Sequence, residues 1–350
     1  MESAHRRRRA LLKKAITKKG LDSFLVTSQT NISYLSGFTG QDSMLLITAS
    51  SDFFITDSRF IEDARDNLKG FQFEVVGTST YETIGDIADK KRLRKMGFEA
   101  MDLPFEVVMK LRKVLRRCRT FGVSDLVESF RQVKDEAEIE SIRSSIRLLK
   151  DSLNRLLSAI RPGVSEKSLA RICESAFLAE GASAAFDPIV AAGVNASKPH
   201  ARPTDEPIRK NSFVMIDIGC RLNGYCSDLT RMVVLGKVKE KFKKIYDTVR
   251  VAQEKAIDKV APGVMACEVD RAARDYIEKQ GFGKYFGHSV GHGVGMQVHE
   301  GPAISRANRA SLRPGMVFTV EPAIYIPRFG GVRIEDMVLV TDGGCNVLTR

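Results

Sequence analysis

The sequence contains no apolar run that approaches the roughly 20 residues needed for a membrane-spanning helix. Its arginine-rich start, Arg6 to Arg9, is followed by mixed residues with further lysines, and the apolar core of a signal peptide does not follow. These two absences predict a soluble, cytoplasmic protein with no membrane partner.

Closely spaced cysteine pairs and aromatic residues near the basic start are also missing. The six cysteines are scattered without a CxxC pair, so we expect reduced thiols. The first 20 residues carry eight of the lysines and arginines of a chain whose net charge is +12. No aromatic side chain interleaves with this cluster, although base stacking would require one. We therefore expect a solvated helix with a basic face, and no nucleic-acid partner.

The chain does have the size for two domains, because it has 350 residues, of which 43% are hydrophobic. Short β-rich stretches, such as residues 24–26 and 44–47, alternate with helical patterns such as 106–117, which predicts a small α/β domain over residues 1–130. Residues 134–160 have apolar positions at helical spacing. We place the boundary between 125 and 134, with a second domain over 131–350.

The sequence pattern of the second domain predicts two similar halves, each with a helix pair followed by strands. Helices are expected over residues 134–160, 166–180, 238–260 and 266–280, and strands within 185–235 and 316–341. A helix pair followed by strands, twice over, indicates an internal duplication, although no clean sequence repeat accompanies it. The fold class is therefore α+β.

A first pair of carboxylates is set by a hairpin pattern. Asp217 interrupts an apolar strand pattern over residues 213–218, where a carboxylate is costly unless it is paired or bound to a metal. Asn223-Gly224 predicts a type I′ turn, which makes Asp217 and Asp228 diagonal neighbours on one face, roughly 7–8 Å apart at the backbone. Two exposed strand carboxylates remain an alternative.

A second pair is Glu321 and Glu335, in the strand patterns 316–325 and 332–340. A hairpin centred on Arg328 puts the two glutamates opposite each other, where like charges repel unless a cation lies between them or solvent softens the repulsion. Four of the five histidines lie in the same domain: His200, His288, His292 and His299. Carboxylates with a histidine suit Mn²⁺, Co²⁺, Fe²⁺ or Zn²⁺. Two such ions can activate a bridging water.

These residues lie in motifs that resemble those of the pita-bread metallopeptidases, in the branch of aminopeptidase P and prolidase. The motifs are Asp217-Ile-Gly-(x)4-Gly-Tyr-Cys-Ser-Asp228-Leu-Thr-Arg231, Gly193-Val-Asn195-(x)3-Pro199-His200, Gly291-His292-Gly293-Val-Gly295, Glu321-Pro322 and Val332-Arg333-Ile-Glu335-Asp336. The resemblance covers nearly the whole chain. It implies a creatinase-like α/β N-terminal domain followed by a pita-bread catalytic domain, built from duplicated helix pairs and an antiparallel sheet.

The resemblance also implies a metal centre and an activity. Asp217 would chelate one of two divalent ions, with Mn²⁺ as the first choice. His292 and Glu321 would hold the other ion, and Asp228 and Glu335 would bridge both. The implied reaction is hydrolysis of the Xaa-Pro imide bond at the N-terminus of dipeptides or short peptides by a hydroxide that bridges the metals. A homodimer is implied as well.

The remaining site residues receive their roles from the same resemblance. Glu321 would pass a proton from the attacking water to the leaving proline nitrogen. His200 and His299 would bind the substrate and stabilise the tetrahedral intermediate. His288 and Arg333 would line the proline side or brace the metal shell. Cys226 shares a strand face with Asp228, and the resemblance gives it no role.

Other functions remain open at this stage. Gly287 to Gly291 matches the GxSxG pattern of serine hydrolases, but no histidine follows His299 to complete a triad. A catalytically silent binding module and a methionine-type aminopeptidase are further alternatives. The choice between aminopeptidase P and dipeptidase is harder, and the short N-terminal domain favours the dipeptidase slightly. A dipeptidase needs a cation for the proline carboxylate, for which Arg202 and Arg328 are candidates.

Overall fold

The computed structural model describes the backbone of residues 2–350 and the side chains of residues 4–350. The chain divides into two compact units, of which the first ends at Arg131 and the second spans Gln132–Arg350.

The first unit is built on a mixed sheet of six strands. Strand β1 (Ser23–Val26) pairs antiparallel with β2 (Ser43–Thr48) and parallel with β5 (Lys95–Glu99). The full strand order is β4-β3-β2-β1-β5-β6, with β3 at Asp52–Thr56, β4 at Gln72–Val75 and β6 at Arg119–Val123. The helices are α1 (Glu2–Lys18), α2 (Gln29–Ser36), α3 (Ile61–Asn67), α4 (Thr80–Lys90), α5 (Phe105–Val114) and α6 (Glu128–Arg131). This is the α/β arrangement that the alternating sequence patterns predict.

Helix α1 departs from the solvated basic helix expected from the sequence. The side chains of Arg8 and Arg9 are buried. Arg9 Nε donates to Asp52 Oδ2 at 2.9 Å, and the Arg8 guanidinium lies 4.1 Å from the centre of the Tyr34 ring. Because a buried guanidinium is stable only when it is paired, these two cations fix α1 to the rest of its unit. The expectation of a wholly solvated basic face is wrong at these two positions.

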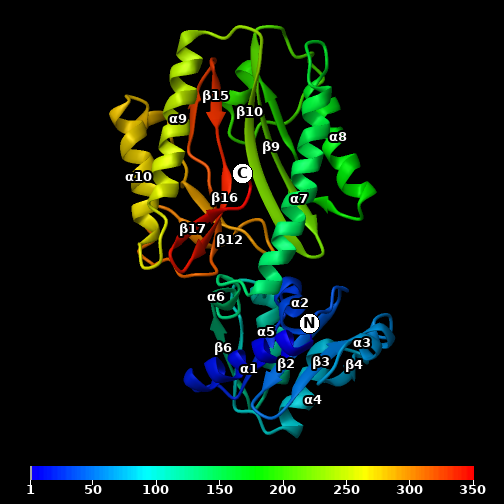
Figure 1. Ribbon diagram of the computed structural model, residues 1–350. Helices are drawn as coiled ribbons and strands as arrows, with labels where there is room; N and C mark the ends of the chain where they lie inside the picture. Colours follow the sequence, from blue (N-terminus) through cyan, green and yellow to red (C-terminus); the bar gives the residue numbers. More distant parts are fainter. Residues whose placement is uncertain (1) are drawn as a thin grey trace. The chain divides into compact units, whose positions relative to one another are not determined.

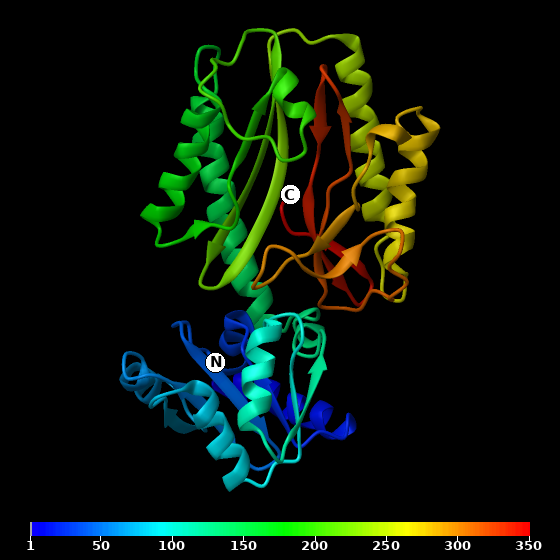
Figure 2. The ribbon, with the colours of Figure 1, turned by 180° about the vertical axis from the view of Figure 1, so that it is seen from behind.

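The second unit places a helix pair on either side of its strands, as Figures 1 and 2 show from opposite directions. One pair is α7 (Glu136–Ala159) with α8 (Glu166–Ala179), and the other is α9 (Glu240–Asp258) with α10 (Ala266–Lys279). Helix α7 begins with a capping box, in which Asp135 accepts from the Glu138 amide and Glu138 accepts from the Asp135 amide. Its buried stripe packs against the strands β9 and β10.

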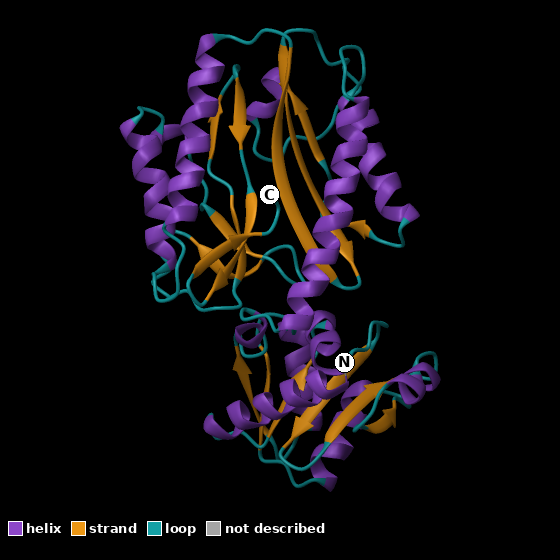
Figure 3. Cartoon of the chain, viewed as in Figure 1, coloured by secondary structure: helices purple, strands orange, loops and turns teal. Residues whose placement is uncertain are grey.

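The strands between the helix pairs form three sheets, visible in orange in Figure 3. The first contains β7 (Ser183–Ala184), β8 (Ile189–Ala192), β9 (Ser212–Leu222) and β10 (Tyr225–Leu235). The second has the order β12-β11-β13-β16-β17, with β11 at Gly291–Gly293, β12 at Glu300–Ile304, β13 at Val317–Val320, β16 at Asp336–Thr341 and β17 at Gly344–Val347. The third is the hairpin of β14 (Ala323–Ile326) and β15 (Gly330–Arg333).

The two long strands expected over residues 316–325 and 332–340 are each interrupted. Val320 pairs with Asp336 at the end of one ladder, and Ala323 pairs with Arg333 at the start of the next. Pro322 has no N–H to donate to a ladder. The amide of Glu321 donates to Val290 O at 2.7 Å, and the amide of Glu335 donates to Thr230 O at 3.3 Å. The ladder therefore opens at the two glutamates, because their amides bind neighbouring segments instead.

Candidate active site

The first carboxylate pair stands on the β9–β10 hairpin, whose turn has the backbone of a type I′ turn, with φ of 50° at Asn223 and 82° at Gly224. Asp217 lies opposite Thr230, and Asp228 lies opposite Gly219. The two aspartates are therefore diagonal neighbours on one face, as the sequence predicts. Both are buried.

The second carboxylate pair stands at the opening between two ladders. Both ladders have one register, so Glu321 and Glu335 lie across from each other even though neither belongs to a strand. The predicted opposition of the two glutamates is confirmed, and the hairpin loop is centred on Arg328. Thr319 donates to Glu321 Oε1 at 3.0 Å and accepts from the His292 amide at 3.1 Å.

Close backbone packing brings the histidine segment to these carboxylates. A Cβ atom at Gly291 would lie 1.8 Å from Thr319 O, so only glycine lets β11 approach β13 this closely. His292 Nε2 then lies 3.2 Å from Glu321 Oε1 and 3.7 Å from Asp228 Oδ2. The His299 ring stands edge-on to that of His292, with 4.2 Å between centroids.

A single cavity of about 1250 Å³ collects all the site residues derived from the sequence. Its lining includes Asp217, Asp228, Glu321, Glu335, His200, His288, His292, His299 and Arg333. Of the two candidate cations for a substrate carboxylate, Arg202 lines this cavity and Arg328 is not among the lining residues. Cys226 is buried in an apolar cluster with Ile142 and Val294, away from the cavity lining.

Several carboxylate oxygens of the site lack hydrogen-bond donors, as expected of atoms that bind cations. Ligand atoms of Asp228, His292 and Glu335 all lie within 4.8 Å of one another. Among the described residues, Asp217 Oδ1, Asp228 Oδ1 and Glu335 Oε1 are buried without a hydrogen-bond donor. Buried carboxylate oxygens need donors or cations, and oxygen-rich sites with one nitrogen suit divalent ions. The residues present therefore fit a divalent metal centre.

Electrostatics lead to the same inference. Burial, and then the charge of Asp228, raise the pKa of Glu335 well above its usual value. Burial, and then the charge of Asp217, do the same for the pKa of Asp228. For Glu321, burial raises the pKa, but the hydrogen bond and charge of His292 outweigh it and hold the pKa at about 2. Cations among these groups would favour the ionised carboxylates that the protein alone disfavours.

Arg333 is the cation of the carboxylate motifs that pairs directly with a carboxylate of the proposed metal site. Its Nη2 pairs with Asp217 Oδ2, its Nε donates to Thr230 Oγ1 at 3.1 Å, and its Nη1 donates to Pro199 O at 3.2 Å. The same Nη1 contacts the buried phenol oxygen of Tyr325. Arg333 thus joins the carboxylates to the loop that carries His200.

Sequence reasoning missed several residues that support the site. Thr230 lies two residues after Asp228 on β10, so alternation from Asp228 could have found it. Tyr325 pairs with Gly331, two residues before Arg333, so it shares the strand face of Arg333. Alternation from Glu321 could also have placed Thr319 on the face of the glutamate, but not its bond to the His292 amide, which depends on β13 pairing with the distant segment β11.

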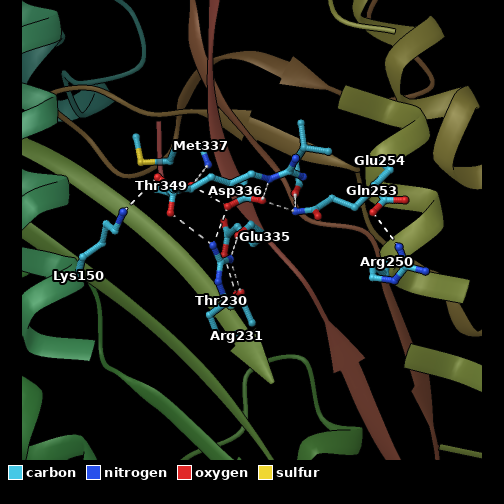
Figure 4. Close-up of polar contacts among 12 residues, drawn as sticks. Lys150, Thr230, Arg231, Arg250, Gln253, Glu254, Glu335, Asp336, Met337 and Thr349 are labelled. Atoms are coloured by element: carbon cyan, nitrogen blue, oxygen red, sulfur yellow. Dashed lines mark hydrogen bonds and ion pairs between the residues drawn. The ribbon is translucent and has the colours of Figure 1, made fainter. Parts of the chain in front are cut away.

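Asp336, the residue after Glu335, is buried and accepts hydrogen bonds from several elements (Figure 4). Asp336 accepts from Arg231 Nη2 at 2.7 Å, from Thr349 Oγ1 at 2.8 Å and from Gln253 Nε2 at 3.2 Å. The Arg231 guanidinium also donates to Glu335 O at 2.5 Å. These hydrogen bonds link β10, β16 and α9, and they therefore fix the backbone of Glu335.

Within residues 2–350, none of the helices combines the length and the apolar character that crossing a membrane would require.

Comparison with known proteins agrees with this architecture. Residues 140–342 match the model of metallopeptidase family M24, and residues 8–133 match the creatinase/prolidase N-terminal domain. The chain is 35% identical over 337 residues to a protein named Xaa-Pro dipeptidase from Pyrococcus horikoshii, covering 95% of this chain and 94% of the relative.

Solved structures agree at the level of the whole fold. A Xaa-Pro dipeptidase from Bacillus anthracis superposes with a TM-score of 0.96 at 34% identity, covering 99% of this chain and 98% of the other. An X-Pro aminopeptidase from Thermotoga maritima gives a TM-score of 0.88 at 34% identity, covering 95% and 96%. The predicted fold class and the resemblance drawn from the motifs are confirmed. The chain therefore belongs to metallopeptidase family M24 and carries a creatinase/prolidase N-terminal domain ahead of its peptidase domain.

Proposed function

We propose that this protein hydrolyses the imide bond between an N-terminal residue and proline, with a preference for dipeptides. The observation that carries the proposal is the cavity in which buried carboxylates with unmet oxygens meet four histidines. Relatives named as Xaa-Pro dipeptidase and X-Pro aminopeptidase support the substrate class. Both names occur among these relatives, so they support cleavage before proline, and the preference for dipeptides is a further proposal.

We assign the metal ligands as the motifs imply. Asp217 would hold one divalent ion, His292 and Glu321 would hold a second, and Asp228 and Glu335 would contribute to both. When bound, the ions supply an acidified water and polarise the scissile carbonyl. We propose Mn²⁺ as the native ion, because four carboxylates and a single imidazole make a hard, oxygen-rich site.

Glu321 is proposed as the proton carrier. An imide nitrogen has no hydrogen of its own and must gain a proton before it leaves. The Glu321 side chain is 15% exposed, and the Thr319 hydroxyl orients the carboxylate by donating to Oε1 at 3.0 Å. It takes the proton of the attacking water and delivers it to the proline nitrogen, which is general base and then general acid catalysis by one group.

The remaining polar groups of the cavity bind and orient the peptide. Burial, and then the charge of His292, lower the pKa of His299. His299 and His200 both line the cavity, and they donate hydrogen bonds to the substrate as negative charge develops on the carbonyl oxygen. His288 has a buried Nε2 without a partner among the described residues and stands 5.8 Å from the Tyr325 ring. His288 and Arg333 form the proline side of the cavity and brace the carboxylates.

The proposal is tested with chelated protein to which Mn²⁺, Co²⁺, Zn²⁺ or Fe²⁺ is returned one at a time. Release of the N-terminal residue is measured from Ala-Pro, Ala-Pro-Ala, Ala-Ala and Met-Ala-Ser. We expect no turnover without metal, the fastest turnover of Ala-Pro with Mn²⁺, and none of Ala-Ala. Faster cleavage of Met-Ala-Ser than of either proline peptide would replace the proposal with a methionine-type aminopeptidase.

The proposed assembly is a homodimer, as the family resemblance implies. Light scattering at micromolar concentration measures it directly, and a monomeric mass contradicts it.

A further inference from the structure

The loop that carries His200 has little regular structure to hold its position. It leaves β8 at Ala192, passes through the short 3₁₀ helix η1 (Gly193–Ser197), and runs past His200 to Thr204. His200 and its neighbours Pro199 and Ala201 line the active-site cavity. A side chain that must meet a developing charge needs a fixed backbone, so the loop must be anchored from outside itself.

Glu166, at the start of α8, supplies such an anchor. Its side chain is buried, with 3% of the residue exposed. Oε1 accepts from the Ala192 amide at 2.6 Å. Oε2 accepts from Asn195 Nδ2 at 2.9 Å and from both the amide and the hydroxyl of Thr204, each at 2.8 Å. One carboxylate therefore joins the beginning of the loop to its end.

The ordinary reason for an acidic residue in the first turn of a helix is interaction with the helix dipole. Such a residue needs no distant partners and is usually solvated. The four hydrogen bonds that the Glu166 carboxylate accepts instead come from the loop, and bonds to a charged acceptor are stronger than neutral ones. The acidic residue at the start of α8 therefore stabilises the loop.

The other side of the loop rests on the active site itself. Arg333 Nη1 donates to Pro199 O at 3.2 Å. A Cβ atom at Gly331 would lie 2.2 Å from Ala196 O, so the loop lies directly on the backbone of β15. Asn195 Nδ2 also reaches Arg202 O at 3.2 Å, beyond His200 in the chain. His200 is thus held between Glu166 on one side and Arg333 on the other.

We infer that Glu166 is a positioning residue for His200, and that it contributes to turnover by holding the 192–204 loop in one arrangement. This inference rests on the proposed peptidase function. Glu166 touches no reacting atom. Its carboxylate sets where the His200 imidazole stands, and a displacement of about 1 Å in such a group can slow a reaction by about a hundredfold.

The test is a double-mutant cycle of Glu166→Gln and His200→Ala on metal-loaded protein. The amide is isosteric, but its NH2 group faces an N–H donor and it carries no charge. We expect Glu166→Gln to lower kcat for Ala-Pro by about tenfold to a hundredfold in the wild-type background and by less than about twofold in the His200→Ala background. Equal losses in both backgrounds, or no loss in the wild type, overturn the inference.

A second readout is independent of turnover. Amide hydrogen exchange across residues 192–204 should speed up in Glu166→Gln, while exchange in β9 stays unchanged. Glu180→Gln makes the same chemical change at the exposed end of α8 and should leave both turnover and exchange unchanged. Unchanged exchange in the loop of Glu166→Gln contradicts the inference. If Glu166→Gln does not fold, Thr204→Val removes a single bond to the carboxylate and is expected to give a smaller effect of the same kind in both readouts.

The two readouts separate the inference from the function on which it rests. If wild-type protein with metal does not cleave Ala-Pro, the proposed function fails. Faster loop exchange in Glu166→Gln would then still support the anchor, and unchanged exchange would remove it as well.

Discussion

The hydroxyl of Thr230 donates a hydrogen bond of 2.6 Å to Oε2 of Glu335, a proposed bridging ligand. Thr230 is fully buried and also accepts from Arg333 Nε. We expect Thr230→Val, which keeps the shape and removes the hydroxyl, to weaken metal affinity by about tenfold to a hundredfold, since groups that orient ligands have effects of this size. Titration of chelated protein with Mn²⁺ measures the change.

The matched control for Thr230 is Thr230→Ser, which keeps the hydroxyl. It should bind metal nearly as the wild type does. If serine weakens binding as much as valine, packing at this position matters and the hydrogen bond to Glu335 does not.

Replacement of Asp228 by Asn should empty the proposed metal centre. It removes one charge from the carboxylate cluster and leaves an amide where a bridging oxygen is needed. We expect metal content to fall and turnover to drop by more than about a thousandfold. Elemental analysis and Ala-Pro hydrolysis measure the two effects. Asp187→Asn changes an exposed carboxylate of the same cavity and should keep the metal. Full metal content in Asp228→Asn would contradict the ligand assignment.

Glu99 in the first unit should make stability depend on pH in an unusual direction. Burial raises the pKa of this carboxyl to about 7, with the charge of Glu128 adding to the effect and hydrogen bonds from the Ser28 and Thr27 amides opposing it. The folded state then holds a proton that the unfolded state releases above its ordinary pKa of 4.5. The contribution is fully present below pH 4.5, falls as pH rises, and is lost above about pH 7.

The difference between the Glu99 pKa of about 7 in the folded state and 4.5 in the unfolded state corresponds to about 3 kcal/mol in the free energy of unfolding. Urea unfolding followed by circular dichroism at several pH values between 4.5 and 8 measures this slope. Glu99→Gln should flatten it, and Glu62→Gln, at an exposed position in the same unit, should not. A wild-type stability that instead falls on acidification through this range would show that the hydrogen bonds to Glu99 outweigh its burial.

Arg202 and Arg328 should differ in their effect on dipeptide binding. Arg202 lines the cavity, and its carbonyl is held by Asn195, whereas Arg328 lies at the tip of the β14–β15 hairpin. We expect Arg202→Ala to raise KM for Ala-Pro by about tenfold, the loss of one charge-assisted contact, and to leave KM for Ala-Pro-amide unchanged. Arg328→Ala should change neither KM. Equal effects on acid and amide would exclude a contact with the carboxylate.

The sequence predicts the parts of the site that depend on local pairing. The Asn223-Gly224 turn fixes the register of Asp217 and Asp228, and the hairpin around Arg328 fixes that of Glu321 and Glu335. It does not reveal that the long strands open at the glutamates, because that break depends on amides binding Val290 and Thr230 from distant segments. It does not reveal the burial of Arg8 and Arg9 for the same reason, since their partners lie far along the chain.

The β14–β15 hairpin lies beyond the opening at Glu321 and Glu335 and continues the register of the β13–β16 ladder. The ladders on either side of the opening are in phase, so Tyr325 and Arg333 of the hairpin reach the cavity only while the two arms have equal length. Removing one residue from a single arm would turn Tyr325 or Arg333 to the opposite face of the strand. Natural or engineered changes of length should therefore be tolerated at the tip, residues 327–329, and not within the arms.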